Sequence, residues 1–390
     1  MKKLWLLLLV IILLVTTSVV TVARAKQGQE EPVLTDMEAL GKALFFDEQL
    51  SINNNQSCAS CHDPVWGFTG PDSDINDHGA VYEGSIAGEF GNRKPPSAAY
   101  ATLSPILYMD KKGMWIGGNF WDGRATGEIL GNPAADQAQG PFLNPKEQAL
   151  PDVAAVIQKL KDSSSPDYET MFQEVWAIDI NDSTKTAEVF GDLALSIAAY
   201  EGSFEVNAFS SKFDYAKKGM AKLTKEEQRG FALFNGKGKC SNCHFSNGQN
   251  PLFTDFTFDN LGVPPNPDNP VYDYDPGFVD YGLGGYLQSA GYSEEVYMAE
   301  WGKQKVPTLR NVDKRLEEGS VKAYGHNGYF KSLEEIVHFY NTRDIAEEGW
   351  PAPEVGENVN TDELGDLGLT PEEEEAIVAF LETLSDGYTP

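Results

Sequence analysis

Two short stretches decide the fold of this chain: "CASCH", residues 58–62, and "CSNCH", residues 240–244. Together they contain all four cysteines of the 390-residue sequence. Each stretch holds two cysteines separated by two residues, with a histidine directly after the second cysteine. This spacing is the attachment pattern of c-type haem. The histidine then lies under the iron as its proximal ligand.

The two motifs therefore predict two covalently bound c-type haems, one on each half of the chain. The predicted attachment residues and proximal ligands are Cys58, Cys61 and His62 for the first haem, and Cys240, Cys243 and His244 for the second. Disulfides are the ordinary use of four cysteines in an exported protein, but this spacing argues against them. A structural zinc site would normally gather four ligands, whereas each cluster has three.

An internal repeat also supports two similar domains. "LTDMEALGKALF" (residues 34–45) precedes the first motif, and "LTKEEQRGFALF" (residues 223–234) precedes the second. Both begin with a Thr-x-x-Glu capping box, which predicts the start of a helix. Gly41 and Gly230 occupy the same offset in the two segments. Each predicted helix leads through a loop into its cysteine motif, as the first helix of a cytochrome c domain does.

The end of the chain repeats this organisation. "SLEEIVHFY" (residues 332–340) and "TPEEEEAIVAFLETL" (residues 370–384) predict two further helices, the second with its own capping box. Segments such as "PPNPDNPVYDYDPG" (residues 264–277) are too rich in proline, asparagine and aspartate for core elements, and they predict loops. The expected fold is mainly α: two cytochrome c-like haem domains with long connecting loops, over residues 26–205 and 206–390.

The N-terminus has the features of an export signal. Two lysines precede the uncharged apolar run of residues 4–15, and Ala-Arg-Ala at positions 23–25 forms a small-x-small cleavage site. This order predicts a signal peptide over residues 1–25 and a periplasmic mature chain that begins near Lys26. An uncleaved membrane anchor is the alternative, because the uncharged length is enough to span a bilayer.

The chain is strongly acidic. Its formal charge is −29, and it becomes −32 without residues 1–25, which carry two lysines and one arginine. Such a surface repels nucleic acid phosphates, so no nucleic acid partner is expected. It attracts a small basic protein at low salt. Acidity also serves simply to keep an exported protein soluble, and charge alone does not separate these roles.

Five further motifs complete a family resemblance. They are, in chain order, "LFFDEQLS", "FWDGRATG", "DQAQGPFLNPKEQA", "VPTLRNV" and "GHNG". With the two haem motifs, and in this order, they resemble the bacterial dihaem cytochrome c peroxidase/MauG superfamily over nearly the whole chain. The resemblance implies a peroxide-binding haem in the N-terminal domain and an electron-transfer haem in the C-terminal domain. Homodimers are common in the family, and the sequence leaves the choice between monomer and homodimer open.

Residues for peroxide chemistry follow from this resemblance. Splitting peroxide requires a group that moves a proton from the inner to the outer oxygen, so that water leaves rather than hydroxide. The family places a glutamine and a glutamate ten positions apart for this work, and Gln137 and Glu147 fit that spacing. We expect Glu147 to be the distal acid/base and Gln137 its supporting hydrogen-bonder. The alternative for Glu147 is a solvated loop carboxylate.

Three more side chains take roles from the resemblance. Trp121 of "FWDGR" is expected between the haems, where its indole relays electrons, and core packing is the alternative. Arg124 and Arg310 are candidates for pairing with haem propionates, and surface ion pairs are their alternative.

Three histidines remain beside the two proximal ones. His78 is a candidate for a removable sixth ligand of the N-terminal haem, against an ordinary exposed loop histidine. His326 of "GHNG" is expected near the C-terminal haem in a supporting role, and His338 on a helix face. Family members often hold one calcium ion between the domains. The asparagine usual before "P(S/T)" is replaced here by Lys94, which leaves calcium open.

The sixth ligand of the C-terminal haem lies fourteen positions after the histidine of "HNG" in the family. It is methionine in the peroxidases and tyrosine in the MauG branch, and from His326 this count reaches Tyr340. A neutral thioether favours ferrous iron, whereas an anionic phenolate favours ferric and higher states. A buried core tyrosine is the alternative. Met298, and behind it Met109 or Met114, would then supply the ligand.

The function expected is a dihaem peroxidase-like oxidoreductase that reduces hydrogen peroxide with electrons from a small cytochrome c or cupredoxin. A MauG-type enzyme that oxidises side chains of a partner protein is the second expectation. A dihaem electron carrier without peroxide chemistry is the third, and the Gln137/Glu147 pair argues against it.

Overall fold

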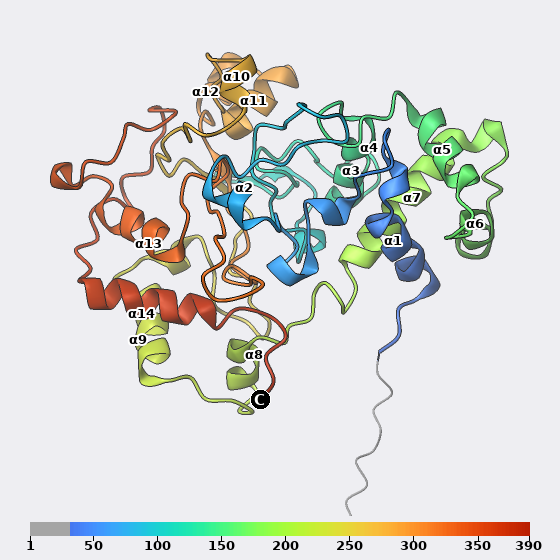
Figure 1. Cartoon of the computed structure of the whole chain (residues 1–390). Helices are drawn as coiled ribbons and strands as arrows, with labels where there is room; N and C mark the ends of the chain where they lie inside the picture. The colour runs from blue at the N-terminus through green and yellow to red at the C-terminus, as the bar shows by residue number, and fades with distance from the viewer. Residues whose placement is uncertain (1–31) are drawn as a thin grey trace, which may run out of the picture. The chain divides into compact units, whose positions relative to one another are not determined.

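The computed structural model describes residues 32–390, so the signal predicted over residues 1–25 lies outside the described part. From Leu34 to Pro390 the chain forms one compact unit. Helices dominate it, and long irregular segments connect them (Figure 1). In the described range, none of the helices has the length and apolar character needed to cross a membrane.

The α-helices carry the labels of Figure 1. They are α1 Asp36–Phe46, α2 Ser73–Asp77, α3 Pro133–Ala138, α4 Gly140–Leu143, α5 Val153–Asp162, α6 Tyr168–Trp176, α7 Thr186–Glu201, α8 Lys212–Lys217, α9 Lys225–Phe234, α10 Val271–Tyr274, α11 Gly282–Ser289, α12 Glu294–Met298, α13 Leu333–Thr342 and α14 Pro371–Glu382. The 3₁₀ turns are η1 Glu48–Leu50, η2 Cys58–Ser60, η3 Pro64–Trp66, η4 Ala101–Leu103, η5 Ser183–Lys185, η6 Cys240–Asn242 and η7 Ala346–Glu348.

Strands are few and short among the described residues. They are β1 Tyr108–Met109, β2 Trp115–Ile116, β3 Phe258–Asp259 and β4 Gln304–Lys305. β1 pairs with β2 and β3 pairs with β4, both antiparallel. The mainly helical fold predicted from the sequence is confirmed.

The predicted capping boxes start the first helix of each half. In α1 the amide of Glu38 donates to Thr35 Oγ1 (3.3 Å), and the amide of Thr35 donates to the Glu38 carboxylate (2.7 Å). Thr224 and Glu227 form the same reciprocal pair at the start of α9. These bonds satisfy amides that no intrahelical carbonyl can reach.

Each of these helices packs on the last helix of its half: α1 against α7, and α9 against α14 (Figure 1). The repeated glycines lie at the two crossings. A Cβ added at Gly41 would lie 1.8 Å from the Ser196 carbonyl oxygen, and one at Gly230 would lie 1.8 Å from that of Ala376. Only glycine permits so close an approach of two helix backbones, which explains why the two segments share it.

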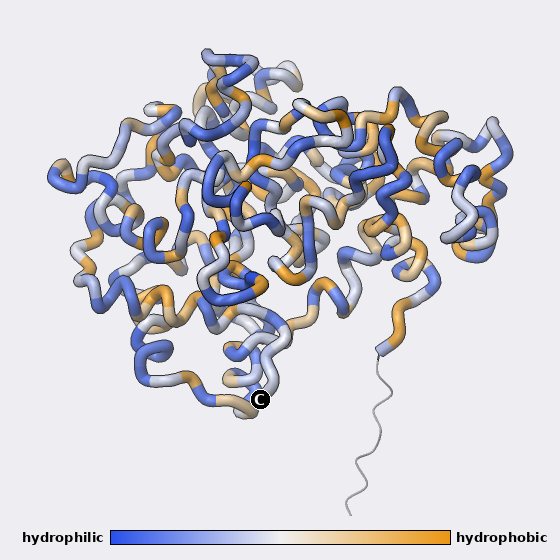
Figure 2. Tube along the Cα trace, in the orientation of Figure 1, coloured by the Kyte–Doolittle hydropathy of each residue, from blue (hydrophilic) through white to orange (hydrophobic). Residues whose placement is uncertain are grey.

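Two principal hydrophobic clusters follow the two halves. One gathers buried residues between Leu40 and Val206, and the other gathers residues between Phe213 and Leu384. Both hydrophilic and hydrophobic residues occur in α14 (Figure 2): four glutamates follow Pro371, and the buried Ala376, Ile377, Val378, Phe380 and Leu381 come after them. The boundary predicted near residue 205 falls close to the point where one cluster gives way to the other, and it stays a prediction.

The two predicted C-terminal helices are present as α13 and α14, the second beginning at the Thr370/Glu373 capping box. The segment 264–277 is irregular as predicted except for α10, a single turn that begins after Pro270.

Candidate haem sites

The first cysteine motif forms one wall of a cavity of about 410 Å³ in the N-terminal half. Cys58 and Cys61 lie on and directly after η2, and His62 follows them. His62 Nδ1 lies 3.1 Å from the carbonyl oxygen of Phe68. Because a carbonyl only accepts, Nδ1 carries the proton, and Nε2 is left as the nitrogen available to a metal. Burial lowers the pKa of His62 to about 4, which keeps the ring neutral as a ligand must be.

The second motif repeats this geometry beside a cavity of about 220 Å³. Cys240 begins η6, and His244 is buried with its Nδ1 2.7 Å from the carbonyl oxygen of Phe253. Burial lowers the pKa of His244 as well. None of the four cysteines of the two motifs forms a disulfide. Two thiols and an oriented neutral imidazole at each cavity fit one c-type haem apiece.

The segments that hold the two histidines are also related. Phe68 and Phe253 both have positive φ, 60° and 53°. The following threonines each donate a side-chain hydrogen bond to a carbonyl of a Lys-x-Pro segment: Thr69 to Pro95 (2.5 Å) and Thr254 to Val306 (2.7 Å). The repeat therefore extends from the helices to the loops beside each histidine.

Gln137 and Glu147 line the same cavity as His62. Gln137 lies on α3, which begins at the Asn132 cap, and Glu147 lies in the turn after α4 with its amide bonded to the Asn144 carbonyl (3.0 Å). Burial raises the pKa of Glu147, while the charge of Arg124 and a hydrogen bond with Asn144 oppose that rise. Both side chains therefore border one cavity, although ten positions separate them in the sequence.

Trp121 lines both cavities. It is 9% exposed, and its indole N–H donates to the Lys94 carbonyl (2.8 Å). Its own carbonyl accepts from the Lys305 amide (2.7 Å). Both neighbouring lysines line the two cavities as well. An oxidisable ring in this position is suited to electron exchange between two sites, and core packing alone would not require it to border both.

Tyr340 lies on α13 and lines the C-terminal cavity. Its hydroxyl makes no hydrogen bond with any residue that the structure describes. Burial raises the pKa of this phenol, and the neighbouring Cys243 and Cys240 raise it further. The alternative ligands lie elsewhere. Met298 ends α12 and does not line this cavity, and neither do Met109 and Met114, which are exposed.

The other histidines lie apart from the N-terminal cavity. His78 ends α2 on the surface, with Nδ1 2.8 Å from the Asp74 carbonyl, and it does not line the cavity of His62. This arrangement gives no support to His78 as a removable ligand. His326 is buried and lines the C-terminal cavity, as expected. His338 contacts Glu374 on the neighbouring helix (3.1 Å).

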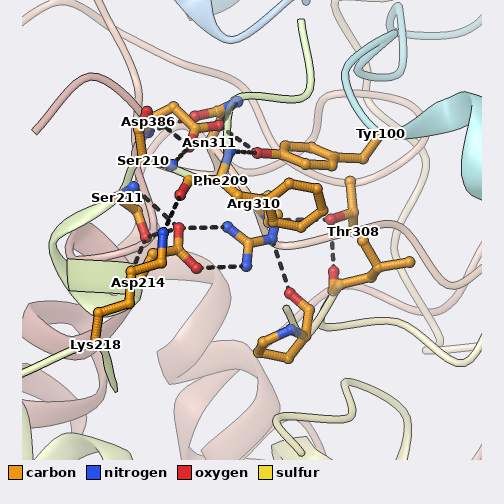
Figure 3. Close-up of polar contacts among 12 residues, drawn as sticks. Tyr100, Phe209, Ser210, Ser211, Asp214, Lys218, Thr308, Arg310, Asn311 and Asp386 are labelled. Carbon is orange, nitrogen blue, oxygen red and sulfur yellow. Dashed lines mark hydrogen bonds and ion pairs between the residues drawn. The ribbon is translucent and has the colours of Figure 1, made fainter. Parts of the chain in front are cut away.

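The two arginines proposed for haem propionates have other partners. Arg310 is fully buried, and its guanidinium forms two 2.9 Å bonds with the Asp214 carboxylate and one of 2.8 Å with the Pro251 carbonyl (Figure 3). Three of its donors are thus engaged by protein acceptors, and its burial excludes the surface ion pair that was the alternative. Arg124 pairs with Asp122 (2.8 Å) and lies over the ring of Phe120.

Sequence reasoning gave no role at the cavities to several ionisable side chains that line them, among them Lys94, Lys305 and Glu201. Lys94 and Lys305 occupy matching places in "KPPS" and "KVPT", a short repeat that was visible in the sequence. Glu201 ends α7, is 4% exposed and lines the N-terminal cavity, and burial raises its pKa to about 8. A lone carboxylate at the end of the apolar run of α7 was its only sequence signal.

The fold and the two cavities together define a class: a helical cytochrome with one haem site in each half and an aromatic side chain that borders both. Comparison with known proteins identifies the family within this class. Residues 35–222 match the family model described as di-haem cytochrome c peroxidase.

Relatives in the family extend over nearly the whole chain. The sequence is 36% identical over 374 residues to the methylamine utilization protein MauG of Paracoccus denitrificans, covering 92% of this chain and 90% of that protein. It is 30% identical over 368 residues to the cytochrome-c peroxidase IdrP1 of Denitromonas iodatirespirans, covering 91% and 83%. The crystal structure of the diheme peroxidase BthA from Burkholderia thailandensis superposes with a TM-score of 0.76 at 30% identity, covering 90% of this chain and 86% of that one.

The chain therefore belongs to the di-haem cytochrome c peroxidase/MauG family. It has the family's two haem domains, and it is an oxidoreductase at the level of the family.

Proposed function

We propose that this protein reduces hydrogen peroxide at the N-terminal haem site with electrons that enter at the C-terminal site. A small cytochrome c or cupredoxin would supply them, and the acidic surface favours a basic donor. The observation that carries the proposal is the placement of Glu147 and Gln137 in the cavity of His62. An electron carrier has no use for a carboxylate and an amide in an open cavity beside its proximal histidine.

The side chains divide the work of the reaction. Bound haem iron supplies the peroxide-binding and redox chemistry. Glu147 accepts a proton from the inner peroxide oxygen and returns it to the outer oxygen, so that water is the leaving group. Its raised pKa suits both halves of this transfer, and Gln137 supports Glu147 by hydrogen bonding. Reduction to two waters consumes two electrons and two further protons, and Trp121 relays electrons between the two sites.

A second function is favoured by one observation. Tyr340 lines the C-terminal cavity, while the candidate methionines do not. A phenolate ligand there would stabilise oxidised iron, which suits a MauG-type enzyme that removes electrons from a partner protein. Similarity to the methylamine utilization protein MauG agrees with this reading. Under either function, we propose that both haems are attached covalently and that the protein is exported to the periplasm. We also propose that the boundary between the two domains lies at residue 205.

The deciding experiment is stopped-flow reaction of Glu147→Gln with peroxide. Because a positioned acid/base contributes about 100- to 10,000-fold, the bimolecular rate constant should fall by that range. Glu128→Gln is the matched control, since Glu128 is exposed and does not line the cavity. If Glu147→Gln reacts with peroxide within a few-fold of the wild-type rate, Glu147 is not the acid/base. The assignment of this cavity as a peroxidase site would then fail as well.

A further inference from the structure

The region between the two cavities contains buried cations from the chain itself. Lys94 is 7% exposed, lines both cavities, and its ammonium donates to Thr69 Oγ1 (2.9 Å) and the Pro95 carbonyl (3.1 Å). The amide of Lys94 ties the two halves by donating to the His326 carbonyl (2.9 Å), while its carbonyl accepts from Trp121 within the N-terminal half.

Two further lysines are held in the same way. The ammonium of Lys322 is bonded to three carbonyls, those of Trp66 (3.0 Å), Asn311 (2.8 Å) and Lys314 (2.8 Å). The ammonium of Lys305 donates to Ser104 Oγ (2.7 Å), Asn119 Oδ1 (3.1 Å) and the Gly118 carbonyl. Carbonyl and hydroxyl oxygens of this kind are the ligands that a hard metal ion would otherwise use.

The buried carboxylates of the region are also engaged. Asp280 accepts two bonds from Arg93 (2.6 and 2.7 Å), and Asp122 accepts one from Arg93 (2.5 Å) and one from Arg124 (2.8 Å). Although burial alone would raise it, Arg93 holds the pKa of Asp280 far below its usual range. Glu354 accepts from the Asp280 amide (3.1 Å).

A calcium ion does not fit this donor set. Calcium takes six to eight oxygen ligands, drawn from carboxylates, carbonyls and waters. Here the ammonium groups of Lys94, Lys305 and Lys322 already occupy the carbonyl and hydroxyl oxygens, and Arg93 occupies the carboxylates of Asp280 and Asp122. Among residues 32–390, the one group of three acidic, cysteine or histidine side chains close enough to share an ion is Cys243, Asp259 and Glu363. That group includes a thiol of the second haem motif, so it is not a calcium site either.

We propose that the ammonium of Lys94 is the interdomain cation of this protein, and that the chain needs no calcium between its haem sites. The adjacent Arg93 neutralises the carboxylates that would have drawn the ion in. This inference concerns the ion alone and holds for either proposed function. Its readouts are metal content, thermal midpoint and the EPR spectrum of the oxidised protein, none of which depends on turnover.

The test uses the purified dihaem protein, dialysed against EGTA and then supplied with calcium to about 1 mM, the upper end of dissociation constants for extracellular calcium modules. The wild type should contain no bound calcium, and its thermal midpoint and EPR spectrum should be the same in both states. Lys94→Asn replaces the ammonium by a carbonyl ligand, and calcium should raise its midpoint by about 0.5–2 °C. Lys111→Asn, at an exposed lysine, should show no such response.

Three results would overturn the proposal. They are one calcium per chain retained by the wild type through EGTA, a wild-type midpoint or EPR spectrum that responds to calcium, and a folded Lys94→Asn protein indifferent to it. If Lys94→Asn fails to fold, the wild-type measurements still decide. Lys94→Met then serves as the second variant, and its thermal midpoint should be lower than that of the wild type with or without calcium. If calcium restored the wild-type midpoint, the proposal would be wrong.

Discussion

Removal of the Arg310 guanidinium separates the structural role found here from the propionate role expected from the sequence. Arg310→Met keeps the length and apolar part of the side chain but deletes three hydrogen bonds: two to Asp214 and one to the Pro251 carbonyl. The guanidinium also lies 4.5 Å from the ring centroid of Phe209 (Figure 3). After the change, Asp214 stays buried, with Ser211 as its remaining partner.

The expected cost follows from burial. The Arg310 and Asp214 side chains are 0% and 1% exposed, so neither is compensated by water when the other is lost. Breaking such a pair by removing one member costs about 3–5 kcal/mol. With an unfolding entropy of about 2.1 cal/mol/K per residue over roughly 360 residues, the thermal midpoint should fall by about 4–7 °C.

Thermal unfolding followed by circular dichroism measures this loss, with Arg310→Met, Asp214→Asn and the double variant in parallel. Because both charges are absent in the double variant, its loss should be smaller than the sum of the single losses. Arg124→Met is the matched control. Arg124 is 43% exposed beside Asp122, and an ion pair of that kind contributes at most about 1 kcal/mol.

One result would refute this structural role of Arg310. If Arg310→Met leaves the midpoint unchanged but shifts the reduction potential of the C-terminal haem, Arg310 contacts the haem rather than Asp214. Strict additivity of the two single variants would likewise show that no buried pair exists.

Three further outcomes are expected. Gly230→Ala should lower stability by about 1–3 kcal/mol or more by thermal unfolding, because its Cβ would lie 1.8 Å from the Ala376 carbonyl oxygen, whereas Gly191→Ala, whose Cβ meets only ordinary contacts, should be neutral or stabilising. Burial raises the pKa of Glu201 from 4.5 to about 8, so the wild type loses stability as pH rises through that window. The thermal midpoint of Glu201→Gln should equal that of the wild type near about pH 5 and exceed it near about pH 9. A difference in midpoint that does not change with pH would contradict this. Tyr340→Phe should abolish a low-spin EPR signal of the oxidised protein if the phenolate is a haem ligand, and unchanged spectra would leave Tyr340 as core packing.

Local chemistry made much of this protein predictable from its sequence. The cysteine motifs, the capping boxes of α1, α9 and α14, and the amphipathic pattern of α13 depend on groups only a few positions apart. Spacing along the chain therefore carried the information, and these elements were found as predicted. The shared Gly41 and Gly230 were also visible, although their reason was not.

Tertiary structure decided what depends on groups that are distant in sequence. Arg310 meets Asp214 from 96 positions away, and Lys322 bonds the Trp66 carbonyl across 256. No periodicity reveals such partners, because a buried charge takes whichever oxygen the fold brings within reach, and leaving it unpaired is costly. The same folding brought Glu147 to the cavity of His62, left His78 outside it, and placed Trp121 at the border of both cavities.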